Sequence, residues 1–290
     1  MGELIGHGSF ANVYRGNFHD TEVAIKVIKF VSLKDMEKSL LEEAGLMVKL
    51  RHPHIVLFMG AGIKMPDLFI VTEFMANGSV RELLDKKEVL LEPEHIKKMC
   101  IEACKGMAFL HSRKIIHRDL KTHNLLVDKY WSVKVADFGL SRAMGDTDGT
   151  MTACGTPSWA APEVLRRDHY SYKADVYSFG ICLWEMNTRK RPYSNLKPYQ
   201  VVIAVATDGL RPDIEGSIPS YFEKLIRVCW NDVPAERPDF PKLREMFEEV
   251  KCPEPKYSNP TYTKAAPDLQ GSQSLPNLAD KNGGSSKQFN

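Results

Sequence analysis

The sequence predicts an α+β protein in which strands come first and helices follow. Within the first 75 residues, short runs such as 23–26 and 68–73 have the composition and alternation of strands. From Val80 onward helical patterns dominate, and the longest of them begins at Pro93. A chain of 290 residues is long enough for two sizeable cores or for one large bilobed domain.

The composition excludes several classes of protein. The net charge of +2 gives no general attraction to nucleic acid or to a membrane surface. Cys100 and Cys104 share one face of a predicted helix, but no second pair of soft ligands completes a zinc site, so we expect core packing. The chain shows no signal-peptide pattern and no apolar run of transmembrane length. We therefore expect a cytoplasmic protein without a membrane segment, and reduced thiols agree with this.

A glycine-containing segment near the N-terminus is the first candidate site. Residues 5–13 read Ile-Gly-His-Gly-Ser-Phe-Ala-Asn-Val. Glycines allow a backbone turn to lie against phosphates with its amides free to donate. A lone Gly-x-Gly is more often a simple hairpin, but here Val13 and the alternating strand that ends in Lys26 follow it.

The pattern of residues 33–50 predicts a helix with one charged residue on its apolar face. Glu43 lies on the same apolar face as Leu40 and Met47. A carboxylate on such a face needs a buried partner, and Lys26 is the obvious candidate.

The next elements are two strands and a long helix. The strands are expected at 55–59 and 68–73, with Gly60 and Gly62 between them. His111 is expected only to end the helix that begins at Pro93. The buried stripe of this helix is predicted to be Ile96, Met99, Cys100, Ala103, Met107 and Leu110.

Polar residues packed between apolar segments indicate the chemistry. Residues 117–124 read His-Arg-Asp-Leu-Lys-Thr-His-Asn, and Asp137 follows the strand expected at 132–136. Burying so many polar groups is costly unless they have partners or a chemical role. Asp119 can accept the proton of an attacking hydroxyl, and Lys121 can neutralise a moving phosphoryl group. Asn124 and Asp137 are hard oxygen ligands for Mg²⁺. A structural ion-pair loop would explain any one of these residues but not the whole string.

These motifs resemble those of eukaryotic protein kinases over about residues 1–250. The resemblance implies a bilobed fold: a small β-rich N-lobe (1–75) with helix C, a hinge at about 73–79, and a larger, mainly helical C-lobe (80–250). An activation segment ends in Ala-Pro-Glu at 161–163. One departure is Ala11, which stands where the family has a third glycine.

The same resemblance implies ATP and Mg²⁺ as cofactors. In it, Lys26 holds the α- and β-phosphates and pairs with Glu43. Thr72 is the gatekeeper beside the adenine pocket, and backbone groups of Glu73 and Met75 bond the base. The expected nucleotide-binding residues are Ile5, Gly6, His7, Gly8, Ser9, Phe10, Ala11, Asn12, Val13, Ala24, Lys26, Glu43, Thr72, Glu73, Met75 and Leu126.

Two residues favour serine or threonine as the acceptor. Lys121 and Thr156 resemble those of serine/threonine kinases, whereas segments 137–142, 175–180 and 209–212 have tyrosine-kinase character. The mixture resembles the tyrosine-kinase-like group, near its Raf, mixed-lineage and plant or protist members. We expect a signalling kinase acting on Ser/Thr hydroxyls of protein substrates, with dual specificity as the alternative.

Two further classes of function are less favoured. A pseudokinase scaffold would lack part of the catalytic set, but Lys26, Glu43, Asp119, Asn124 and Asp137 are all present. A small-molecule phosphotransferase would not need the full activation segment.

The resemblance also implies regulation and internal anchors. Arg118 is expected to receive a phosphate on Thr152, or else on Thr150, added by the enzyme itself or by an upstream kinase. An upstream kinase or a self-dimer is therefore an expected partner. Thr156 is a poorer acceptor because Asp119 and Lys121 should engage its hydroxyl.

Two structural expectations are that Asp175 anchors the catalytic loop and that Glu163 pairs with Arg237. From about residue 251 the composition becomes polar, which predicts a disordered tail over 251–290.

Overall fold

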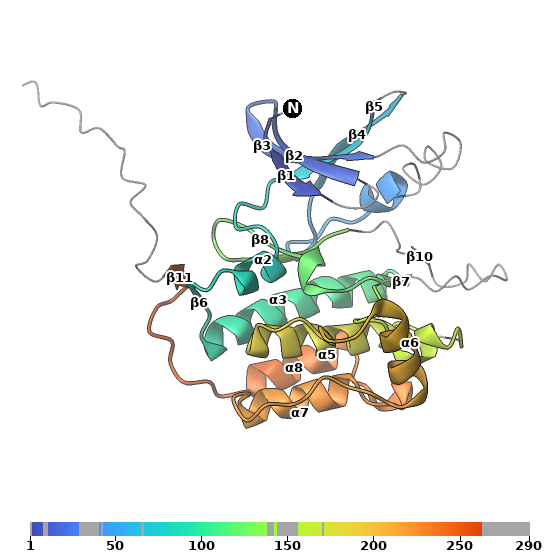
Figure 1. The fold of residues 1–290 in the computed structure, drawn as a ribbon. Helices are drawn as coiled ribbons and strands as arrows, with labels where there is room; N and C mark the ends of the chain where they lie inside the picture. The colour runs from blue at the N-terminus through green and yellow to red at the C-terminus, as the bar shows by residue number, and fades with distance from the viewer. Residues whose placement is uncertain are drawn as a thin grey trace, which may run out of the picture.

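The computed structural model confirms an α+β fold of two lobes, with the β-sheet above and the helices below (Figure 1). No helix in the part of the chain that the structure describes is long and apolar enough to cross a membrane. The described residues are 2–7, 11–28, 41, 43–64, 67–137, 142–143, 156–169 and 171–262.

The N-lobe is an antiparallel five-stranded sheet with the order β1-β2-β3-β5-β4. A two-residue turn at His19 and Asp20, both at positive φ, joins the second and third strands, as tight hairpins require. Of the helix predicted at 33–50, the structure describes residue 41 and residues 43–50, and residues 43–47 are helical. The strands are β1 (Leu4–His7), β2 (Ala11–Phe18), β3 (Thr21–Ile28), β4 (Phe58–Lys64) and β5 (Asp67–Glu73).

The strand predicted at 55–59 is wrong in its bounds, because β4 begins at Phe58 and includes both glycines that were taken to end it. Gly62 has a packing role inside the strand. A Cβ at this position would lie 2.3 Å from the ring of Phe69 on β5, so any larger residue would force that ring to move. Ile55 instead forms an isolated parallel bridge with Val135 of the C-lobe.

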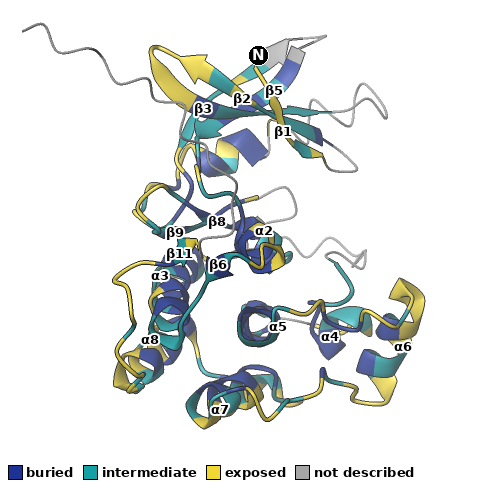
Figure 2. Cartoon of the chain, turned by 60° about the vertical axis from the view of Figure 1, so that its left-hand side comes forward, coloured by how far each residue is buried: buried dark blue, intermediate teal, exposed yellow. Residues whose placement is uncertain are grey.

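The C-lobe is built around α5 (Lys173–Thr188), which is buried along most of its length (Figure 2). α3 (Pro93–Ser112) buries the stripe predicted for it. The other helices are α2 (Val80–Asp85), α4 (Pro162–Leu165), α6 (Pro198–Thr207), α7 (Ser220–Cys229) and α8 (Phe240–Glu249), with single 3-10 turns η1 (Thr122–Asn124) and η2 (Pro234–Glu236).

Short strand pairs frame the loops of the C-lobe. β7 (Ile115–Ile116) pairs with β10 (Arg142–Ala143), and β8 (Leu125–Val127) pairs with β9 (Val133–Val135). β7 and β8 therefore fix the two ends of residues 117–124, and β9 leads to Asp137.

The prediction of a disordered tail is wrong for residues 251–262. β11 (Thr261–Tyr262) pairs with β6 (Val89–Leu90). The amide of Lys256 donates to both carboxylate oxygens of Glu92 at 3.0 Å, and the His95 ring bonds the carbonyl oxygen of Tyr257 at 2.7 Å. Composition could not reveal this order, because it comes from backbone groups that meet a strand edge and the start of α3. Residues 263–290 lie outside the described part of the chain.

Candidate active site

The loop 117–124 is fastened to α5 by a buried carboxylate. Asp175 accepts hydrogen bonds from the backbone amides of His117 and Arg118, each at 2.9 Å. Arg118 adopts a left-handed conformation with φ of 70°, which a non-glycine residue keeps only when its surroundings hold it. The expected anchor is therefore present in the geometry.

A histidine completes this anchor and corrects one expectation. His111 does not merely end α3, because its Nε2 lies 2.9 Å from Asp175 Oδ2. Burial raises the pKa of Asp175, but the hydrogen bond and charge of His111, with the charge of His117 and the Arg118 amide, outweigh it and leave the pKa lowered. Asp175 thus stays ionised at neutral pH.

Asp119, Lys121 and Thr156 form one closed cluster. Lys121 Nζ donates to Asp119 Oδ2 at 2.7 Å and to Thr156 Oγ1 at 2.8 Å. The Thr156 hydroxyl and amide both donate to Asp119 Oδ1 at 3.0 Å. These are the contacts expected for Thr156, and they hold the carboxylate of Asp119 in a single orientation.

Asn124 is oriented by the same loop. Its Nδ2 donates to the carbonyl oxygen of Asp119 at 2.8 Å and to Asp119 Oδ2 at 3.3 Å. Because the amide nitrogen makes these bonds, the amide oxygen is the atom of Asn124 that could act as a hard ligand for a cation.

Lys26 joins the N-lobe to the metal-binding candidate Asp137. Its Nζ lies 2.9 Å from Glu43 Oε1 and 3.1 Å from Asp137 Oδ1. Burial lowers the pKa of Lys26, but the charges of Asp137 and Glu43 outweigh it and raise the pKa above its ordinary value. Glu43 is buried, so the apolar helix face does carry a paired carboxylate. A lysine held between two acids is fully protonated and suited to anionic phosphate oxygens.

The residues expected around adenine come from neighbouring strands. Ala24 lies directly opposite Thr72, and Val13 lies opposite Lys26. Met75 is buried in a small cluster with Val56 and Ala136, against which Leu126 packs. β3 and β5 are therefore paired neighbours, and Met75 of the hinge shares a cluster with Leu126 of β8.

The glycine-containing segment is described only at its ends. Gly6 pairs with Val13 and His7 with Asn12, so β1 and β2 are antiparallel neighbours on either side of this segment. Ile5 is partly exposed and Ala11 is buried. Three residues of the expected phosphate-binding turn, Gly8, Ser9 and Phe10, lie outside the described residues, as do Thr150 and Thr152.

Further contacts agree with the structural expectations. Arg237 and Glu163 form a buried bidentate ion pair with N–O distances of 2.6 and 3.0 Å. Cys100 and Cys104 are fully buried, and burial raises both thiol pKa values. No cluster of three or more His, Cys, Asp or Glu side chains suited to a metal ion occurs among the described residues.

Sequence reasoning missed two ionic contacts near the site. Lys134 Nζ lies 2.7 and 2.8 Å from the two Glu73 oxygens, which ties the hinge to β9. Arg81 pairs with Glu185, which is fully buried in α5. The signal for the second was a lone glutamate in the apolar run 181–186, but its partner is 104 residues away.

Comparison with known proteins gives a consistent result. Residues 1–247 match the model of the family described as protein tyrosine and serine/threonine kinase. The chain is 42% identical over 254 residues to the probable serine/threonine-protein kinase drkB of Dictyostelium discoideum, covering 87% of this chain and 37% of that protein. It is 44% identical over 252 residues to the serine/threonine-protein kinase STY46 of Arabidopsis thaliana, covering 86% and 44%.

A third relative is the serine/threonine-protein kinase CTR1 of Arabidopsis thaliana, 43% identical over 255 residues, with 86% of this chain and 31% of that protein covered. The chain therefore spans less than half the length of these curated relatives.

Proposed function

Because the chain belongs to the protein tyrosine and serine/threonine kinase family, we propose that it transfers the γ-phosphoryl group of Mg-ATP to Ser or Thr hydroxyls of protein substrates. The observation that carries this proposal is the closed cluster of Asp119, Lys121 and Thr156, with distances of 2.7–3.0 Å. A carboxylate fixed beside a lysine suits the acceptance of a hydroxyl proton next to a negatively charged phosphoryl group.

In this proposal each residue has a distinct role. Asp119 orients the acceptor hydroxyl and takes its proton, while Lys121 offsets the negative charge that develops nearby. Lys26 binds the phosphates and is held in place by Glu43. These roles rest on positioning and charge, which are the main contributions of protein kinases to catalysis.

The donor set fits a magnesium nucleotide. Asn124 and Asp137 offer oxygen ligands, and Lys26 Nζ lies 3.1 Å from Asp137, so a cation and its phosphates would meet here. When bound, Mg-ATP would supply the phosphoryl group and the positive charge that neutralises its oxygens. Thr72 would border the adenine pocket, and backbone groups of Glu73 and Met75 would bond the base.

Two features support Ser/Thr over Tyr as the acceptor. The first is that Lys121 contacts both Asp119 and Thr156, an arrangement that resembles the one in serine/threonine kinases. The three relatives reported above are named serine/threonine-protein kinases. Dual specificity is the alternative outcome of the experiment below.

The test is a radiolabelled-ATP assay on separate pools of Ser, Thr and Tyr peptides, followed by phosphoamino-acid analysis. We expect label on Ser and Thr. Asp119→Asn should bind nucleotide but lose about 10³-fold in rate, since general acid–base groups contribute about 10²–10⁴-fold. Asp232→Asn, a change of the same chemistry at a side chain that is 80% exposed, is the matched control. Equal rates for the two variants would refute the assignment, and label on Tyr as well would establish dual specificity.

We also propose that Arg118 receives a phosphate on Thr152 or Thr150, added by an upstream kinase or by a second copy. The fixed backbone of Arg118 supports this, because Asp175 holds its amide beside the catalytic Asp119. A phosphate carries nearly two negative charges and suits bidentate binding by arginine. Phosphatase treatment should lower activity as much as Thr150→Ala/Thr152→Ala does. Full activity after both treatments would exclude the switch.

A further inference from the structure

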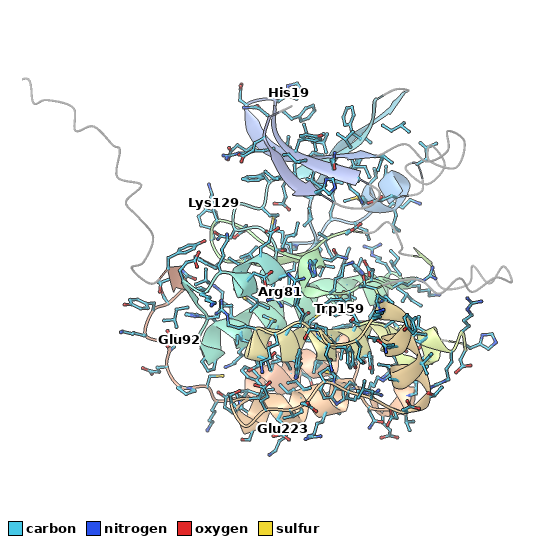
Figure 3. The ribbon with its side chains drawn as sticks, in the orientation of Figure 1. His19, Arg81, Glu92, Lys129, Trp159 and Glu223 are labelled. Carbon is cyan, nitrogen blue, oxygen red and sulfur yellow. The ribbon has the colours of Figure 1, made fainter. Side chains whose placement is uncertain are left out.

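Glu185 of α5 is a buried acid with donors from three separate parts of the chain. Its side chain is fully buried. Arg81 of α2 donates to Oε1 at 3.1 Å, and the Thr122 hydroxyl and the Trp159 indole N–H donate to Oε2 at 2.9 and 2.7 Å. Arg81 and Trp159 lie near each other above α5 (Figure 3).

Two of these donors flank the proposed catalytic cluster. Thr122 is next to Lys121 and three residues after Asp119, and Trp159 is three residues after Thr156. The single oxygen Oε2 of Glu185 therefore binds both the loop that carries Asp119 and the segment that carries Thr156. Those two segments also contact each other directly, at 3.0 Å between Thr156 and Asp119. Glu185 therefore forms a second link between them.

The third donor, Arg81, is the positively charged partner of Glu185. Arg81 is only 2% exposed and also binds Asp85 at 2.9 Å and the carbonyl oxygens of Arg189 and Lys190 at 3.0 and 3.3 Å. Burial raises the pKa of Glu185, and the hydrogen bonds of Trp159 and Thr122 and the charge of Arg81 oppose this effect only in part, so the pKa stays above its ordinary value. Since apolar residues of similar volume often stabilise a core as well as a buried ion pair does, stability alone does not account for these charges.

Hydrogen bonds with fixed directions account for them better. We propose that Glu185 is a positioning residue, which sets the register between the loop of Asp119 and the segment of Thr156 and so aims Asp119 at the acceptor hydroxyl. This inference rests on the proposed kinase function. Because Lys26, Glu43 and the hinge lie elsewhere, nucleotide binding does not depend on Glu185, whereas phosphorylation of peptide does.

The experiment compares steady-state kinetics of three variants that each remove one part of the bridge. Glu185→Gln removes the charge, Thr122→Val removes the hydroxyl, and Trp159→Phe removes the indole N–H. We expect kcat/KM for peptide to fall by about 10–100-fold, since small misplacements of reacting groups cost up to about 100-fold. KM for ATP should stay within about twofold of the wild-type value, because the variants do not alter the residues proposed to bind the nucleotide.

Two controls separate positioning from stability. Asp85→Asn weakens the other ion pair of Arg81, at a carboxylate that is 47% exposed, and leaves the Glu185 bridge in place. Leu243→Ala removes a buried side chain from α8, so it should lose about as much thermal stability as Glu185→Gln does. Both controls should keep wild-type kcat/KM for peptide at a temperature where they are folded.

The outcomes are distinct. If wild-type protein phosphorylates no peptide, the proposed function fails and not this inference alone. If wild-type is active and Glu185→Gln keeps its kcat/KM, or loses no more than Leu243→Ala, the inference is overturned. Should Glu185→Gln fail to fold, Thr122→Val and Trp159→Phe decide the matter, because each retains the ion pair with Arg81. Wild-type activity in both would also overturn it.

Discussion

Asp175→Asn is the sharpest perturbation of the loop that carries Asp119. The carboxylate accepts bonds of 2.9 Å from the His117 amide, the Arg118 amide and His111. Hydrogen bonds to charged groups contribute about 1.5–3 kcal/mol each, and a buried donor left without a partner costs about 1–3 kcal/mol. Asparagine keeps one oxygen as an acceptor but turns an N–H group toward a donor. We therefore expect the free energy of unfolding to fall by about 3 kcal/mol.

The catalytic consequence follows from the backbone of Arg118. Its left-handed conformation costs about 1–2 kcal/mol for a residue with a side chain, so it should relax once its amide is no longer held. Asp119 is the next residue and would move with it. Peptide phosphorylation should fall by about 10–100-fold at a temperature where the variant is folded.

The assay pairs urea unfolding, followed by tryptophan fluorescence, with peptide kinetics. Leu243→Ala on α8 should lose a similar free energy of unfolding, about 2–5 kcal/mol, and keep its catalytic rate. Asp175→Asn with a free energy of unfolding within about 0.5 kcal/mol of wild type would refute the energetic reasoning. A loss of rate equal to that of Leu243→Ala would refute the argument about Arg118.

Three further predictions follow from individual contacts. Glu43→Gln should raise KM for ATP and lower kcat by loosening Lys26, whereas the exposed Glu22→Gln in the same lobe should change neither in a peptide assay. Burial, aided by the charge of Lys121, lowers the pKa of His123 to about 4, whereas the unfolded chain binds this proton at about 6.5. Stability should therefore fall as pH drops from about 6.5 to 4, and melting curves at several pH values should show a smaller fall in His123→Gln. A chain ended at residue 250 should melt about 5 °C below one ended at residue 262, because it loses the pairing of β11 with β6; equal melting temperatures by scanning fluorimetry would contradict this.

Much of the site could be predicted because the residues that carry its chemistry lie close together in short stretches of sequence. Glu43 stood on an apolar helix face, and a buried carboxylate needs a cation, which led to Lys26. The polar string 117–124 between apolar strands indicated a loop with a chemical role before any contact was known. In both cases an energetic cost visible in the sequence identified the residue.

The contacts that were missed have no such local signature. The bounds of β4 depended on how Gly62 accommodates the ring of Phe69 on the next strand. The order of residues 251–262 depended on the free edge of β6. Glu185 was visible as a charge in an apolar helix, but its donors come from α2, η1 and residue 159, and only the tertiary fold brings these together.

The two buried acids of α5 anchor the loop of Asp119 at two points. Asp175 holds the amide of Arg118, and Glu185 holds the hydroxyl of Thr122. The acids are ten residues apart on one helix, or about 15 Å along its axis at 1.5 Å per residue.

Between these anchors Lys121 has φ of −157° and ψ of 163°, the values of an extended strand, whereas Arg118 is left-handed with φ of 70°. Because the loop is anchored on both sides of Asp119, we expect a rotation of Asp119 to strain one of these hydrogen bonds. Loss of Asp175 frees the start of the loop and relaxes the backbone of Arg118, whereas loss of Glu185 frees its end and the segment of Thr156. Both variants should therefore lose stability as well as rate with peptide, because each removes a buried partner. In this proposal α5 is the element that orients the carboxylate of Asp119, the proton acceptor.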